Sequence, residues 1–181
     1  MPTIGDLSLY FHLPFCRKKC PYCDFYVVTD PSLKTSFLKG ILQELFFYSS
    51  LLENSRLVSI YLGGGTPSVF PEGCEKILQA LSPFIDPSVE ITCEVNPEDL
   101  SEELVSRLKQ AGVNRLSIGV QSFQRPLLNV IKRPFPSVEA IEKAHKTISN
   151  LSIDKLEIVL WAFSIASTLG KGLLITLRRG L

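Results

Sequence analysis

The chain has 181 residues, of which 45% are hydrophobic and 20% are charged, and its net charge is +1. A chain of this length and composition is expected to form one globular domain with a substantial core. Nineteen basic residues against eighteen acidic ones leave no charge excess that would attract a nucleic acid, so none is expected as a partner. Neither a leader peptide nor an apolar span of membrane length is visible, so we expect a cytoplasmic protein without a transmembrane segment.

The first predicted strand covers residues 7–13, and Pro14 ends it. Three of the five cysteines follow within eight residues, in a segment that we call the cysteine loop (residues 16–23). Cys16, Cys20 and Cys23 have the spacing C-x3-C-x2-C. Three thiolates on one short loop can ligate three irons of an iron–sulfur cluster, which leaves the fourth iron open to a substrate.

Two other chemistries can use the same cysteines. Cys20 and Cys23 enclose Pro-Tyr as in a dithiol redox motif, but that motif needs a helix directly after its first cysteine. The residues after Cys23 are instead aromatic and β-branched, which favours an extended chain. A zinc site would need a fourth ligand, and His12 is the only histidine nearby. A dithiol redox protein and a zinc site are therefore kept only as the less well supported alternatives to a cluster.

The rest of the chain alternates between helical and extended patterns. Helices are predicted at residues 32–53, 71–83, 101–111 and 137–148, and strands at residues 57–62, 89–95, 114–120 and 151–153. In the first helix Phe37, Ile41 and Leu45 recur at four-residue steps, and Gly112 ends the third helix. This alternation indicates an α/β fold with parallel strands and outer helices, as in a (βα) barrel. In such a barrel the chemistry gathers at the C-terminal ends of the strands.

Polar or glycine-rich segments stand at those strand ends. The second strand runs into Gly63-Gly64-Gly65-Thr66-Pro67, whose glycines would let the backbone approach a ligand closely, or simply make a tight turn. Glu94 ends the third strand and could accept hydrogen bonds from ribose hydroxyls or an ammonium group, or be a solvated acid. Gln121 follows the fourth strand.

Residues 10–16, Tyr-Phe-His-Leu-Pro-Phe-Cys, together with Cys20 and Cys23, resemble the opening of a radical S-adenosylmethionine (SAM) protein. Within that superfamily they resemble the oxygen-independent coproporphyrinogen III oxidase group, which includes the HemW-type haem chaperones. The resemblance implies a partial (βα) barrel of the radical SAM type. It also implies a [4Fe–4S] cluster ligated by Cys16, Cys20 and Cys23, whose open iron is chelated by SAM.

The resemblance further implies which residues contact SAM or flank the cluster. These are Tyr10, Tyr22, Gly64, Gly65, Thr66, Glu94, Gln121, Arg133 and Asp154. Gln121 lies in Gly-Val-Gln-Ser-Phe, which is similar to a motif of the family at the barrel mouth. Arg133 matches a family arginine near a SAM carboxylate, but the histidine that usually follows two residues later is Phe135 here.

Two departures distinguish the branches of the group. Phe25 stands where the porphyrinogen oxidases carry a further cysteine, and only fifteen residues precede Cys16. Both favour a haem chaperone, with haem as a further ligand and with haem-accepting proteins and an electron donor as partners. The alternative is a coproporphyrinogen oxidase, an oxidoreductase that decarboxylates its porphyrinogen, so whether the chain is an enzyme stays open.

The resemblance ends near Asp154. We therefore predict a radical SAM core in residues 1–154 and a divergent or frame-shifted tail in residues 155–181, which leaves the barrel incomplete at its C-terminus. A short paralogue with its own last element is the alternative.

Overall fold

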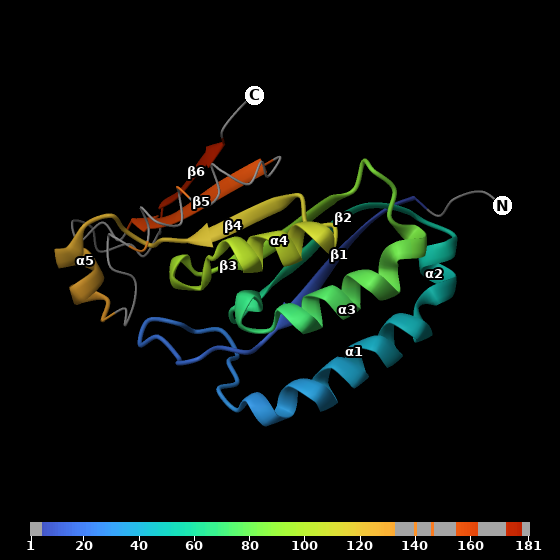
Figure 1. Cartoon of the computed structure of the whole chain (residues 1–181), viewed down its shortest axis with the longest axis horizontal. Helices are drawn as coiled ribbons and strands as arrows, with labels where there is room; N and C mark the ends of the chain where they lie inside the picture. The colour runs from blue at the N-terminus through green and yellow to red at the C-terminus, as the bar shows by residue number, and fades with distance from the viewer. Residues whose placement is uncertain (1–4, 133–139, 141–145, 147–154, 163–172, 179–181) are drawn as a thin grey trace.

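A computed structural model describes residues 5–132, 140, 146, 155–162 and 173–178 of the chain. Its centre is one sheet with the strand order β1-β2-β3-β4-β5-β6 (Figure 1). Each of the first four strands pairs in parallel with the next, and β6 runs antiparallel to β5. The strands are β1 (Asp6–Leu13), β2 (Arg56–Gly64), β3 (Glu90–Val95), β4 (Arg115–Gly119), β5 (Lys155–Ala162) and β6 (Leu173–Arg178). The predicted α/β fold with parallel strands is confirmed.

The helices α1, α3 and α4 lie next to one another on one face of this sheet (Figure 1). The helices are α1 (Lys34–Phe47), α2 (Ser49–Glu53), α3 (Pro71–Leu81), α4 (Glu102–Gln110) and α5 (Arg125–Val130). Short 3₁₀ turns cover Pro31–Leu33, Pro67–Val69, Ser82–Phe84 and Pro97–Asp99. None of the helices in the described part of the chain has the length and apolar character that crossing a membrane requires.

The strands alternate between apolar and polar side chains, which gives the sheet two different faces. Ile60, Leu62, Ile91, Leu116 and Ile118 are almost completely buried and belong to the core that packs against the helices. A parallel sheet covered by helices on both faces would be apolar in nearly every position.

The opposite face carries polar side chains from adjacent strands. Tyr10 of β1 is in register with Tyr61 of β2, and Glu94 of β3 is in register with Ser117 of β4. Strand pairing therefore places these polar side chains side by side towards the C-terminal ends of the strands.

Helix α4 shows how local sequence sets an element's limits. The Ser101 side chain accepts a hydrogen bond from the backbone N–H of Leu104 at 3.1 Å, as expected of an N-cap. Gly112 has a φ of +104°, a left-handed conformation that glycine adopts without strain, and it directly follows the last turn. The predicted helix at residues 101–111 is confirmed within a residue at each end.

Three details differ from the sequence predictions. The helix predicted over residues 32–53 is divided at Tyr48 into α1 and α2, because Tyr48 leaves the helical conformation with a ψ of 10°. Helix α5 was not predicted, since its six residues are too few for a clear periodicity. Strand β2 continues through Gly63 and Gly64, two residues beyond its predicted end.

Strands β5 and β6 lie in the part of the chain that was predicted to be a divergent tail. The strand predicted at residues 151–153 and most of the helix predicted at residues 137–148 lie outside the described residues. Strand β5 extends the parallel array, with Arg115 in register with Lys155 and Gly119 with Val159. Strand β6 then returns antiparallel. The boundary at Asp154 stays a prediction.

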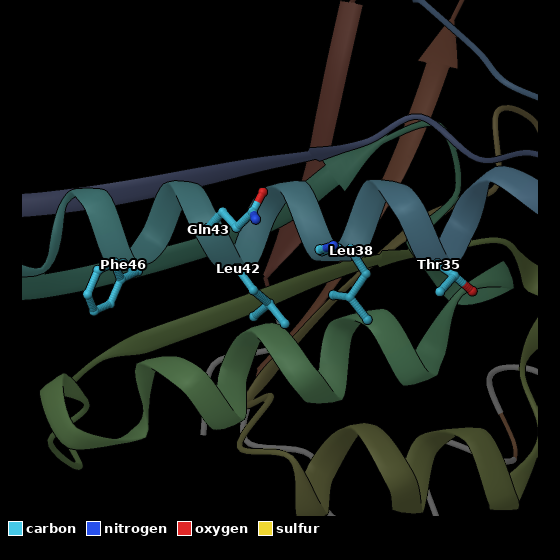
Figure 2. A pocket seen from close by; sticks show the side chains of 6 residues that line it. Thr35, Leu38, Leu42, Gln43 and Phe46 are labelled. Carbon is cyan, nitrogen blue, oxygen red and sulfur yellow. The ribbon is translucent and has the colours of Figure 1, made fainter.

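A shallow groove of about 480 Å³ lies along α1, on the helix-covered side of the sheet. Figure 2 shows Leu38 and Leu42 on the side of α1 that faces the neighbouring helix, with Phe46 nearer the C-terminal end. The groove is mostly apolar, and its lining contains no cysteine, histidine or acidic side chain. The polar strand ends are the better place to look for chemistry.

Candidate cofactor site

The cysteine loop leaves the sheet directly after β1, and its two ends are held together. The N–H of Cys16 donates to the carbonyl of Val28 at 3.0 Å, and the N–H of Val28 donates to the carbonyl of Pro14 at 2.8 Å. Within the loop, the N–H of Cys23 donates to the carbonyl of Cys20 at 3.0 Å, which forms a turn. The backbone therefore closes the loop at its base and presents its three cysteines together beyond the end of β1.

The three thiols are half-buried and close enough to affect one another. Burial raises the pKa of the Cys16 thiol, a hydrogen bond with Thr66 opposes that rise, and the charges of Cys23 and Cys20 add to it. Nowhere in the described residues do three His, Cys, Asp or Glu side chains gather closely enough to hold a metal ion. An iron–sulfur cluster places its thiolate ligands on separate irons, so they are spaced more widely than around a single ion.

The glycine-rich segment packs against the base of the cysteine loop. The N–H of Gly65 donates to the carbonyl of Leu13 at 2.8 Å, and the N–H of Thr66 donates to the carbonyl of Phe15, also at 2.8 Å. A Cβ added to Gly65 would lie 2.7 Å from the backbone carbonyls of Pro14 and Phe15. A glycine is therefore required at this position, because two backbone segments approach more closely than any side chain allows.

Glu94 connects β3 to the glycine-rich segment. Its carboxylate accepts a hydrogen bond from the hydroxyl of Tyr61 at 2.8 Å and another from the N–H of Gly64 at 3.2 Å. Gly64 has a φ of +111°, and a Cβ there would lie 2.7 Å from the His12 ring. Glu94 is thus held in place from two sides at the C-terminal end of its strand.

Aromatic side chains cover the polar face beside Glu94. The rings of Tyr10 and Tyr61 stack, with centroids 5.8 Å apart, and Tyr10 is 57% exposed. Partial burial and the charge of Glu94 raise the pKa of Tyr10, so its hydroxyl stays protonated at neutral pH. Tyr61 was missed from the sequence, although alternation within β2 and its register with Tyr10 place it on the same face. Tyr22, in the cysteine loop, is half-buried.

Gln121 follows β4 in a left-handed conformation, with a φ of +71°. Its side-chain Oε1 is buried and has no hydrogen-bond partner in the described part of the structure. Buried acceptors are almost always satisfied in folded proteins, so an unsatisfied one at a strand end suits a ligand that donates a hydrogen bond. This orphaned oxygen and the three half-buried thiols fit a cluster and SAM. Arg133 and Asp154, the remaining predicted contacts, lie outside the described residues.

Several of the predicted site residues lie at the C-terminal ends of successive strands, and two pairs of them are in contact. Cys16 contacts Thr66, with 3.2 Å between Sγ and Oγ1, and Gly64 contacts Glu94. A Cβ on Gly119 would lie 3.3 Å from Nε2 of Gln121, so this amide lies over the end of β4. Ser68, Asn96 and Asp99, which extend these contacts, were not predicted, because no local pattern distinguishes them from ordinary loop residues.

The described part of the chain is a mainly parallel α/β sheet with a three-cysteine loop beyond its first strand. The radical SAM superfamily model matches residues 10–163, and the chain belongs to that superfamily. Membership implies a [4Fe–4S] cluster and SAM as cofactors.

Individual proteins that the chain resembles belong to one group within this superfamily. The chain is 40% identical over 157 residues to the haem chaperone HemW of Lactococcus lactis, covering 81% of this chain and 40% of that protein. It is 37% identical over 162 residues to HemW of Buchnera aphidicola from Schizaphis graminum, covering 85% of this chain and 43% of that protein. The structure of coproporphyrinogen III oxidase (HemN) from Escherichia coli is similar with a TM-score of 0.77 at 25% identity, covering 88% of this chain and 38% of that one. The chain thus spans about two fifths of the length of these relatives.

Proposed function

We propose that this chain is the cofactor-binding part of a haem chaperone of the HemW type. The observation that carries the proposal is the closed cysteine loop, whose Cys16 contacts the glycine-rich segment beside a polar sheet face. The similarity to HemW proteins supports haem as the molecule that is handled. A haem-accepting protein and an electron donor are the partners that this function requires.

In this proposal each part of the site has a separate role. Cys16, Cys20 and Cys23 ligate the cluster, which supplies an electron to SAM when both are bound. Gly64 and Glu94 border the polar face on which SAM would lie, with Tyr10 covering it. Gln121 accepts a hydrogen bond from the cofactor through its buried Oε1. Arg133 and Asp154 complete the proposed set of contacts.

The second candidate is an oxygen-independent coproporphyrinogen III oxidase. The similarity to the HemN structure favours it, because that protein is an oxidase with the same fold. Phe25 argues against it, since the resemblance to the oxidases calls for a cysteine there. Dithiol chemistry through Cys20 and Cys23 remains a remote third candidate.

One series of measurements separates these candidates. The 181-residue chain is reconstituted anaerobically with iron and sulfide, both are counted, and the reduced protein is examined by EPR. A haem titration and a coproporphyrinogen decarboxylation assay follow on the same sample. Four irons per chain with haem binding and no decarboxylation support the chaperone, whereas decarboxylation identifies the oxidase. Protein that takes up no iron but exchanges disulfides would overturn both.

Replacing Glu94 by glutamine tests the proposed SAM face. The change keeps the shape of the side chain but removes the negative charge, so a hydrogen bond from SAM to this position should weaken. We expect SAM to bind about tenfold more weakly, because a hydrogen bond to a charged group contributes about 1.5–3 kcal/mol. Binding is measured by isothermal titration to the reconstituted protein.

The control for this change is Glu53→Gln, which removes an exposed carboxylate from the end of α2. It should leave SAM affinity unchanged. Equal affinities for the wild-type and Glu94→Gln proteins would show that Glu94 only holds Tyr61 and Gly64 in place.

A further inference from the structure

Polar side chains connect the cysteine loop to the two loops that follow β2 and β3. Thr66 and Ser68 belong to the first of these loops, and Asn96 and Asp99 to the second. Thr66 and Ser68 are buried, and the Asp99 side chain is only 2% exposed. Buried polar groups of this kind stay in a fold only when they satisfy one another, so their hydrogen bonds can be followed one by one.

The direction of the bonds around Thr66 follows from which atoms carry protons. Nδ2 of Asn96 can only donate, and it lies 3.2 Å from Oγ1 of Thr66, which therefore accepts. The hydroxyl proton of Thr66 is then free to point at Sγ of Cys16, 3.2 Å from Oγ1. A thiolate has no proton and can only accept, so the Thr66 hydroxyl is the donor once Cys16 is ionised.

A second series of bonds holds the backbone of Asn96, from which its side chain reaches Thr66. The backbone N–H of Asn96 donates to Oγ of Ser68 at 3.4 Å, and the Ser68 hydroxyl donates to Oδ2 of Asp99 at 2.6 Å. The other carboxylate oxygen of Asp99 accepts from the guanidinium of Arg17. Arg17 is the residue after Cys16, so the network begins and ends in the cysteine loop.

We propose that Thr66 is a positioning residue for the cluster, in that its hydroxyl donates to the Cys16 thiolate in a direction set by Asn96. The proposal rests on the proposed cluster site. A hydrogen bond to a ligand sulfur stabilises the reduced cluster more than the oxidised one, because the reduced cluster carries one more negative charge. Thr66 therefore raises the reduction potential of the cluster, a role distinct from the direct SAM contact that the resemblance implies.

The test is a redox titration of the reconstituted protein, followed by the EPR signal of the reduced cluster. Thr66→Val keeps the shape of the side chain and removes the donor. At a fixed potential we expect its ratio of reduced to oxidised cluster to be about tenfold lower than in the wild type. For a one-electron couple this corresponds to a reduction potential about 59 mV lower. Thr66→Ser restores a hydroxyl and should keep the ratio within about twofold of the wild type.

Thr92→Val is the matched control. Thr92 is a buried threonine on β3 whose hydroxyl accepts from the guanidinium of Arg115 at 3.2 Å, away from the cysteine loop. This change should leave the ratio of reduced to oxidised cluster unaltered. A change as large as that of Thr66→Val would mean that the loss of any buried hydroxyl disturbs the cluster, which would overturn the proposal.

A second variant covers the case in which Thr66→Val protein takes up no cluster. Asn96→Leu removes the amide that orients Thr66 without adding charge, and it should lower the ratio about threefold. A Thr66→Val or Asn96→Leu protein that holds a cluster and titrates like the wild type overturns the role of Thr66 and leaves the proposed function intact. Wild-type protein that holds no cluster overturns the proposed function instead.

Discussion

Replacing Cys16 by alanine should leave the reconstituted protein without a stable cluster, the largest effect that we expect of any single change. Two thiolates remain, and a [4Fe–4S] cluster held at only two irons is exposed to loss of the others. The absorption at about 400 nm that is typical of such clusters should disappear, and bound iron should fall well below half of the wild-type amount. Absorption and iron counting after anaerobic reconstitution measure both.

The control uses a cysteine outside the loop. Cys74 is fully buried in α3 and belongs to the hydrophobic core, as does Cys93 of β3. Cys74→Ala removes one buried sulfur atom and should cost about 1 kcal/mol of stability while leaving the cluster intact. Full iron content in the Cys16→Ala protein, or its loss in Cys74→Ala, would contradict the assignment of the ligands.

The second large effect is expected from Gly65→Ala. The new methyl group would lie 2.7 Å from the backbone of Pro14 and Phe15, and backbone cannot move aside as the end of a flexible side chain can. The glycine-rich segment must therefore separate from the base of the cysteine loop. We expect a loss of about 2–3 kcal/mol in the free energy of unfolding and about half of the cluster content. Urea unfolding and iron counting measure the two losses.

Gly40→Ala is the matched change elsewhere in the chain. Gly40 lies inside α1, and a Cβ there would meet no heavy atom within 4 Å. Alanine favours a helix by about 1 kcal/mol over glycine, so this protein should be slightly more stable, with unchanged iron. If Gly65→Ala were equally harmless, the close approach of the two backbone segments would not be what holds the cysteine loop in place.

The sequence by itself determined the elements and the chemistry that they bring. The alternation of helical and extended patterns predicted strands β2 to β4 and helix α4, and Gly112 predicted the end of α4, because local propensity and capping act within a few residues. The spacing of three cysteines on one loop predicted an iron–sulfur cluster, with dithiol redox chemistry and a zinc site as alternatives, because that spacing is itself local. Gln121 and Glu94 were placed at strand ends for the same reason.

Only the tertiary structure decided how these parts meet. Strand register brings Tyr61 beside Tyr10, and folding brings Asp99 to Arg17, 82 residues earlier in the chain. Folding also explains why position 65 must be glycine. The backbone that Gly65 approaches lies some fifty residues earlier in the chain, so the residues next to Gly65 in the sequence do not reveal the contact. Such contacts depend on the packing of separate elements in three dimensions, and local sequence patterns carry no information about that packing.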